Sequence, residues 1–286
     1  MPTDGTVSNT SIQITRKSRS NLAIALSCLP GERKKDMISF YAFCRVLDDI
    51  ADDPEVSISA RQAEMDRWRA GLLVGDKSIH SVMAEVLDLA GKYGFDRGLL
   101  VEILDGMASD LVCDRYATFS DLLAYCYKVA SAVGLVSIEI FGYKNPRCKE
   151  YAVNLGYALQ LTNIIRDVGQ DARESGRVYL SGDLMAAHGV TERQILNGSY
   201  DERFRSLMED MHQRAVSYFE KTATLLPPED RGSMIAAEMM AQVYREILEK
   251  VRKSEFRVFD TRVRLHPVRK LWILGSFFAK KFWNFR

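Results

Sequence analysis

From Pro30 onward, apolar residues recur every three or four positions, and this periodicity limits the possible folds more than any other feature. The clearest run is Met37, Phe40, Tyr41, Cys44 and Leu47. Spacing of three and four gathers side chains on one face of an α-helix, whereas a half-buried strand would alternate. Alternating stretches are scarce in the chain. The sequence therefore predicts an all-α protein.

Short turn signals divide this pattern into separate helices. We expect long helices at residues 33–53, 60–73, 78–92, 96–112, 119–142, 146–173, 201–225 and 229–252, and shorter pieces at 181–197 and 267–283. The expected organisation is a flexible segment at 1–17, one helical domain at 18–265, and a basic, aromatic helix or tail at 266–286. Residues 119–142 and 146–173 are apolar on several faces, so we place them at the centre of the bundle.

Charge and cysteine usage restrict the possible partners and compartments. The net charge of +1 offers no basic footprint for nucleic acid, so no nucleic-acid partner is expected. The five cysteines include no CxxC pair, which argues against a disulfide framework or a zinc site. The N-terminus has no apolar core of signal-peptide length, and no apolar run reaches the roughly 18 residues that span a bilayer. We expect a cytoplasmic protein.

The C-terminal segment 266–286 combines basic and aromatic residues without any acidic residue. Its cations are Arg269, Lys270, Lys280, Lys281 and Arg286. Two interpretations are open. The segment packs on the core with its lysines in solvent, or it lies in the headgroup region at the inner face of the membrane, where apolar burial and anionic lipid both favour binding.

The first chemical signal is the stretch FYAFCRVLDDIADD at residues 40–53. On a helix, Asp48 and Asp52 share one face, Asp49 and Asp53 form a second pair, and Arg45 lies on the same side as Asp48. Carboxylates this close repel one another unless a cation lies between them. Magnesium suits such clusters and binds substrate phosphates as well. The alternative is a solvated acidic helix end before the following proline.

The second signal is NLGYALQLTNIIRDVGQDARESGRVYL at residues 154–180. Gln160, Asn163, Asp167 and Asp171 follow 3-4-4 spacing and form one polar stripe along an otherwise apolar helix. Polar groups are costly to bury without partners, so the stripe suits a cavity that holds metal ions and phosphates. The alternative is an ordinary amphipathic surface helix.

Together the two stripes could hold magnesium ions and a diphosphate between facing helices. Such metals act as Lewis acids and allow an allylic carbon–oxygen bond to ionise. Between the stripes lies YCYKVASAVGLVSIEIFGY, residues 125–143, in which Ala130, Ser131, Ala132 and Gly134 keep one side slender. That slender side provides room for a ligand chain or permits close helix packing. The chain has no HExxH, GxSxG, P-loop or GxGxxG pattern.

With both acidic motifs, the YCYKVASAVG segment and RVYL in this order, the chain resembles the squalene and phytoene synthase family from about Ser18 to Lys270. The resemblance implies the isoprenoid synthase fold, a single helical bundle around a central apolar cavity. It implies a magnesium-dependent prenyl transferase that joins two prenyl diphosphates head to head. The implied magnesium ligands are Asp48, Asp52, Asp167 and Asp171, with Asp49 and Asn163 in support.

The resemblance also implies roles for residues outside the metal ligands. Positions near the diphosphates are matched by Arg45, Gln160 and Arg166, and aromatic positions at the cavity by Tyr41, Tyr127, Tyr179 and Tyr244. Arg262 and Lys270 match late basic residues that reach phosphate, and Ser20 and Asn21 match a polar pair at the N-terminal entrance. Leu22 and Lys128 depart from the family pattern, which affects the mouth and depth of the channel rather than the chemistry.

Within the family, VASAVGLVSIEIFGY and VRLHPVRKLWIL look most like bacterial presqualene diphosphate synthases of hopanoid pathways. This likeness implies condensation of two farnesyl diphosphates to presqualene diphosphate with release of diphosphate. The alternatives are a phytoene synthase, which uses two geranylgeranyl diphosphates, and a squalene or dehydrosqualene synthase. Outside this reaction, the alternatives are a terpene cyclase and a non-catalytic isoprenoid-binding subunit on the same fold.

Overall fold

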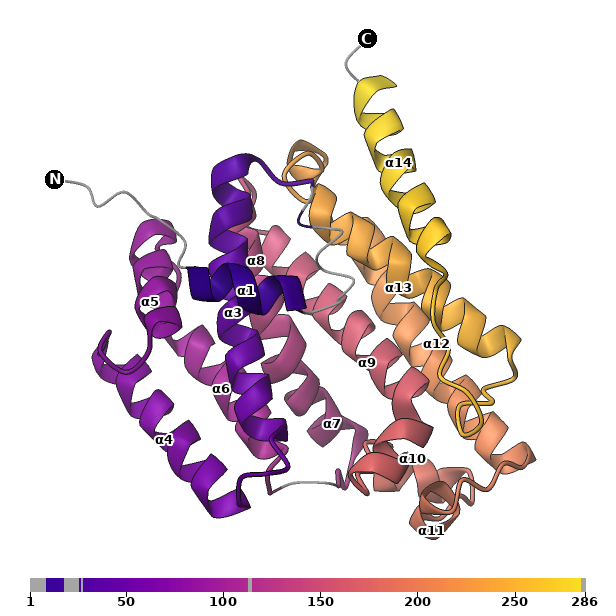
Figure 1. Cartoon of the computed structure of the whole chain (residues 1–286). Helices are drawn as coiled ribbons and strands as arrows, with labels where there is room; N and C mark the ends of the chain where they lie inside the picture. The colour runs from indigo at the N-terminus through magenta and orange to yellow at the C-terminus, as the bar shows by residue number, and fades with distance from the viewer. Residues whose placement is uncertain (1–8, 18–25, 27, 113–114, 284–286) are drawn as a thin grey trace, which may run out of the picture.

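The helices expected from the apolar periodicity are present, nearly with the expected bounds, in the computed structural model (Figure 1). It describes residues 9–17, 26, 28–112 and 115–283. The elements are α1 (Asn9–Lys17), α3 (Gly31–Asp52), α4 (Ile58–Val74), α5 (Ser81–Tyr93), α6 (Gly98–Ser109), α7 (Phe119–Cys126), η1 (Tyr127–Ser131), α8 (Ala132–Phe141), α9 (Cys148–Glu174), α10 (Gly182–Ala187), α11 (Glu192–Leu196), α12 (Glu202–Leu225), η2 (Pro228–Asp230), α13 (Ile235–Lys253) and α14 (Pro267–Trp283). The all-α prediction is confirmed.

Local capping chemistry explains where several of these helices begin and end. The Ser57 side chain accepts a hydrogen bond from the Ala60 backbone N–H at the start of α4, and α4 ends at Gly75 in the left-handed conformation. Thr118 and Asp121 form a reciprocal capping box at the start of α7. These residues satisfy backbone groups that a helix end leaves without partners.

Two sequence expectations need correction. Residues 181–197 form two short helices, α10 and α11, because Gly189 adopts a φ of 65° between them and Thr191 caps the second. The segment 1–17 is not flexible throughout, since residues 9–17 form α1, which packs on α3 and α5. The buried Ser11 hydroxyl donates to the Glu85 carboxylate at 2.9 and 3.0 Å, a tertiary contact that polar composition does not reveal.

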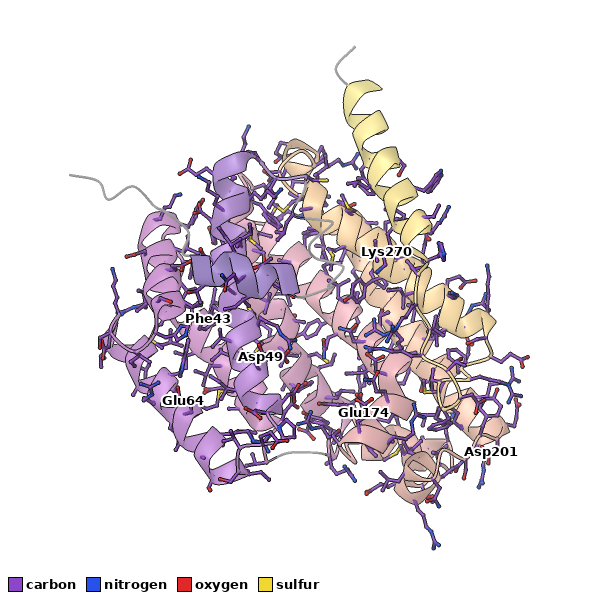
Figure 2. The ribbon with its side chains drawn as sticks, viewed as in Figure 1. Phe43, Asp49, Glu64, Glu174, Asp201 and Lys270 are labelled. Atoms are coloured by element: carbon purple, nitrogen blue, oxygen red, sulfur yellow. The ribbon has the colours of Figure 1, made fainter. Side chains whose placement is uncertain are left out.

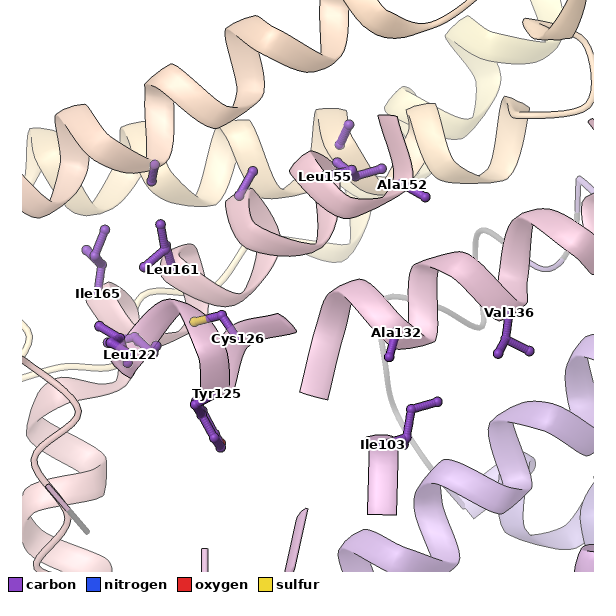
Figure 3. Close-up of a cluster of buried hydrophobic side chains, with 14 of the residues drawn as sticks. Ile103, Leu122, Tyr125, Cys126, Ala132, Val136, Ala152, Leu155, Leu161 and Ile165 are labelled. Atoms are coloured by element: carbon purple, nitrogen blue, oxygen red, sulfur yellow. The ribbon is translucent and has the colours of Figure 1, made fainter. Parts of the chain in front are cut away.

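The centre of the bundle is formed by the continuous helix α7–η1–α8 packed against α9, as expected. Figure 3 shows Leu122 and Cys126 from the first helix near Leu161 and Ile165 of α9. The η1 turn has π-helical geometry, which often accompanies functional sites because it re-aims side chains.

Close approach of these two central helices depends on a glycine. A Cβ added at Gly156 of α9 would lie 2.5 Å from the Ser131 Cα in η1. The Ser131 hydroxyl donates to the Val153 carbonyl at 2.9 Å and joins the same two helices. The small residues of the 125–143 segment therefore permit close helix packing, in addition to any room that they leave for a ligand chain.

The continuous helix Phe119–Phe141 also bears on the membrane question. In the described chain it is the one helix whose length and composition would allow it to cross a membrane. The sequence expectation that no segment is long and apolar enough to span a bilayer is therefore corrected. Lys128 and Glu139 interrupt the apolar run in this helix, but the helix as a whole remains apolar. In this structure the helix lies in the bundle centre against α9, which accounts for its apolar character without a bilayer.

The last part of the described chain crosses the front of α9 before α14 begins. We call residues 254–266 the strap. Glu255 and Phe256 adopt left-handed φ values of 54° and 56°, which turn the chain back after α13. α14 then packs beside α13 through its first turns and extends away from the bundle (Figure 1).

Candidate active site

Two neighbouring cavities, one apolar and one polar, define the candidate site. The apolar cavity has a volume of about 270 Å³ and is enclosed by α3, η1–α8, α9 and α13. The polar cavity, of about 700 Å³, lies beyond the C-terminal ends of α3, α6 and α9. The α9 stripe links them, because Gln160 and Asn163 line the apolar cavity and Asp171 lines the polar one.

The carboxylates of α3 lie on the side of the site opposite the strap. Arg45 forms ion pairs with Asp48, at 2.6 Å, and with Asp49. Figure 2 shows Asp49 on α3, with Lys270 at the start of α14 across the front of α9. Partial burial raises the pKa of Asp48 to about 6; Arg45 opposes this shift, while the charges of Asp52 and Asp49 add to it. Arg45 alone therefore does not neutralise the negative charge of the α3 carboxylates.

The polar cavity brings Asp52 of α3 and Asp171 of α9 to one space. Burial, together with the charge of Asp167, raises the pKa of Asp171 to about 7, although Arg177 and Arg262 favour the ionised form. The Arg177 guanidinium lies 3.7 Å from the Asp52 carboxylate. Like the α3 cluster, this group of carboxylates would be stabilised by an added cation.

The middle of the α9 stripe is held by arginines. Both Asp167 carboxylate oxygens accept hydrogen bonds from Arg166 and from Arg262, and the Arg262 pair measures 2.9 and 3.1 Å. Lys270 lies close enough to Arg166 and Arg264 that their charges, after burial, lower its pKa. The basic residues expected to reach phosphate, Arg166, Arg262 and Lys270, are thus gathered at one end of the site.

The remaining predicted residues are placed unevenly. Tyr41 and Tyr244 line the apolar cavity with Gln160 and Asn163. Tyr179 points elsewhere and donates to Asp110 at 2.9 Å. Tyr127 begins η1 and is not among the residues that line either of these two cavities. Ser20 and Asn21 lie outside the described residues.

Two site residues escaped sequence reasoning. Asp110, just after α6, lines the polar cavity and accepts hydrogen bonds from Tyr125 at 3.0 Å and from Tyr179. Burial raises the pKa of Asp110, while Arg177 opposes this. Arg177 lies in the RVYL motif, in which the family resemblance assigns a role only to Tyr179. A lone Asp at a helix end carries no periodic signal, so Asp110 could not have been found without the fold.

The donor set fits divalent magnesium. It consists of carboxylates and one amide, the oxygen ligands that this ion prefers. The Asn163 Oδ1 is buried and has no hydrogen-bond partner within the described ranges, which leaves an acceptor directed at the site. No three His, Cys, Asp or Glu side chains in those ranges converge tightly enough to hold a metal alone. Bound magnesium would therefore take only part of its shell from these side chains and would complete it with water and substrate oxygens.

The chain is similar to known proteins along most of its length. Residues 15–269 match the family described as squalene/phytoene synthase. The chain is 33% identical to the phytoene synthase of Arthrospira platensis over 92% of its own length and 89% of that protein. It is 30% identical to the 15-cis-phytoene synthase of Synechococcus elongatus, over 91% and 88% of the two chains. A dehydrosqualene synthase crystal structure with a ligand superimposes with a TM-score of 0.83 at 27% identity, covering 96% of each chain.

The chain therefore belongs to the squalene/phytoene synthase family, and its bundle is the isoprenoid synthase fold. Members of this family are prenyl transferases that condense prenyl diphosphates head to head. The predicted fold, family and enzyme class are confirmed. Family membership alone does not determine which prenyl diphosphate the chain uses.

Proposed function

We propose that this protein joins two prenyl diphosphates through a cyclopropylcarbinyl diphosphate and releases diphosphate. The observation that carries the proposal is the shared α9 stripe, which runs from an apolar cavity to a cavity lined by Asp52 and Asp171. An amphiphilic substrate needs both environments at once: the first accepts its hydrocarbon chain, and the second binds its charged end.

The carboxylates would hold magnesium. We assign Asp48, Asp52, Asp167 and Asp171 as ligands, with Asp49 and Asn163 in support. Magnesium, when bound, supplies Lewis acidity that stabilises the departing diphosphate. Arg45, Arg166 and Lys270 would bind the remaining phosphate charge, since charged hydrogen bonds to phosphate are strong and directional.

The apolar cavity would protect the allylic cation from water. Phe40 and Tyr41 of α3 and Tyr244 of α13 line it. Aromatic faces attract cations and carry no nucleophile that would trap them. Excluding water matters because hydrolysis competes with carbon–carbon bond formation.

For the substrate we propose geranylgeranyl diphosphate, with phytoene as the product. The support is the 30–33% identity to two phytoene synthases over about nine-tenths of the chain. This reverses the order expected from the sequence, in which farnesyl diphosphate and presqualene diphosphate came first. Farnesyl diphosphate remains the second candidate, favoured by the likeness to a dehydrosqualene synthase across 96% of the chain.

One incubation tests both candidates. Purified protein, magnesium and either geranylgeranyl or farnesyl diphosphate are combined with and without NADPH, and the products are analysed by mass spectrometry. Phytoene from the longer substrate, at the higher kcat/KM, supports the first candidate. Presqualene diphosphate or dehydrosqualene formed from the shorter substrate, at the higher kcat/KM and unchanged by NADPH, supports the second. If neither substrate yields a head-to-head product, the proposed reaction is wrong.

Peripheral membrane contact through α14 is a further part of the proposal. Val268 and Trp272 are 66% and 58% exposed, and Arg269 stacks on the Trp272 ring at 4.2 Å. A neighbouring face of the helix packs on the core through the buried Ile273. An exposed aromatic beside basic residues suits an anionic headgroup layer, and the substrates are themselves amphiphiles.

A further inference from the structure

The strap is fastened to α9 by contacts that do not involve Arg262. A Cβ added at Gly169 would lie 2.3 Å from the Val258 carbonyl oxygen, so only glycine permits this approach. The Arg173 guanidinium donates to the Phe259 carbonyl at 2.5 Å. The strap backbone is therefore positioned on α9 whatever the Arg262 side chain does.

The Arg262 side chain reaches from this fixed backbone to Asp167. Its Nε lies 2.9 Å from Oδ1 and its Nη2 lies 3.1 Å from Oδ2, a two-pronged pair across 95 positions of sequence. Arg166 donates to the same two oxygens. Each oxygen of Asp167 thus already accepts two charged hydrogen bonds, which leaves little capacity for a metal ion.

If Asp167 is to bind a metal, one arginine must leave, and the surroundings indicate which. The Arg166 side chain is 12% exposed and lies on the same helix as Asp167. Arg262 is 36% exposed and reaches over from the strap. Moving Arg166 would strand a buried charge, whereas Arg262 can turn toward the open side of the site at lower cost.

We propose that Arg262 is an exchangeable counter-ion, paired with Asp167 in the metal-free protein and with the substrate diphosphate once a divalent cation occupies Asp167. This inference rests on the proposed function, in which Asp167 is a metal ligand. A guanidinium fits carboxylate and phosphate with the same forked geometry, so the exchange replaces one partner by a similar one. The exchange also keeps Asp167 neutralised before metal binds and keeps the arginine away from the cation afterwards.

Binding measurements without turnover test the exchange. Mn²⁺ serves as the probe, followed by electron paramagnetic resonance, first alone and then with inorganic pyrophosphate. Arg262→Gln should bind Mn²⁺ alone about fivefold more tightly than wild type, the scale of one partly exposed ion pair. With Mn²⁺ saturating, the same variant should bind pyrophosphate about tenfold more weakly, because a charged hydrogen-bond donor is lost. Arg257→Gln, an exposed strap arginine that stacks on the Tyr200 ring, is the matched control and should follow wild type in both measurements.

The opposite signs distinguish exchange from a structural role. Loss of a merely structural arginine would weaken both Mn²⁺ and pyrophosphate binding, and that result overturns the proposal. The variant Asp167→Asn tests the assignment of Asp167 as a metal ligand separately from the exchange proposed for Arg262. If Asp167→Asn loses Mn²⁺ while Arg262→Gln binds it no more tightly than wild type, the metal site stands and the exchange is wrong. If Asp167→Asn keeps wild-type Mn²⁺ affinity, the metal assignment fails, and the exchange fails with it.

Discussion

Replacing Gly156 by alanine should destabilise the protein, although alanine is the better helix former. The added Cβ would lie 2.5 Å from the Ser131 Cα and 2.6 Å from its nitrogen, whereas ordinary contact begins at 3.4 Å. The two central helices must therefore separate by about 1 Å, and overpacking of this kind costs about 1–3 kcal/mol. Alanine returns up to about 1 kcal/mol through helix propensity.

After this offset the net loss should be up to about 2 kcal/mol in the free energy of unfolding, which lowers Tm by as much as roughly 4–8 °C in a chain of this size. Thermal unfolding followed by far-ultraviolet circular dichroism measures the shift. Because the nearest atoms belong to the Ser131 backbone, the added change Ser131→Gly should not restore stability. Turnover should fall as well, since Gly156 lines the apolar cavity.

Gly91→Ala in α5 is the matched control. A Cβ there meets nothing within 4 Å, so only helix propensity changes, and stability should rise by up to about 1 kcal/mol. If Gly156→Ala raised Tm as Gly91→Ala does, the close packing of α9 against η1 would not have the energetic role assigned to it.

Three further predictions concern the site, pH and membrane contact. Asp48→Asn should lower kcat by about 10²-fold or more at saturating magnesium while keeping wild-type helicity. The control Asp66→Asn changes an exposed carboxylate and should keep wild-type turnover. Near-normal kcat in Asp48→Asn would contradict the metal assignment. Burial lowers the pKa of His212 in the folded protein. As pH falls, His212 is therefore protonated in the unfolded chain before it is protonated in the folded one. The free energy of unfolding should then decrease below about pH 6.5, by at most about 1.4 kcal/mol per pH unit. Urea unfolding should show a flatter pH dependence in His212→Gln but not in the exposed His266→Gln, and equal slopes in all three proteins would exclude this cause. Trp272→Gln should weaken sedimentation with anionic vesicles at low salt, and unchanged binding would remove that residue from the contact.

Much of the fold followed from local patterns. The three-and-four spacing that begins at Met37 located the helices, because helix formation buries one face and depends on neighbouring residues. The same logic failed at residues 9–17, where a helix is held by Ser11 and Glu85, 74 positions apart. It also merged α10 with α11, because a single left-handed glycine is a weak signal within a short segment.

The two acidic stripes proposed to bind metal could be found in the sequence because each lies on one helix. Asp48 and Asp52 are one turn apart, as are Asp167 and Asp171, so their spacing alone specifies a shared face. Tyr179 shows the limit of that reasoning. Its motif was recognised, yet its hydroxyl faces Asp110 instead of the apolar cavity, because the loop after α9 and not a helical repeat sets its direction.

The sequence by itself determined an all-helical chain, two carboxylate-bearing helices and the family to which the chain belongs. Only the tertiary structure placed Asp110 and Arg177 in the polar cavity with Asp52, and only the path of the strap brought Arg262 onto Asp167. The physical reason is the range of each interaction. Helix periodicity acts over a few residues and is written in the order of the chain. A contact between residues 95 positions apart depends on how the intervening helices pack and on a glycine, Gly169, that lets two backbones meet.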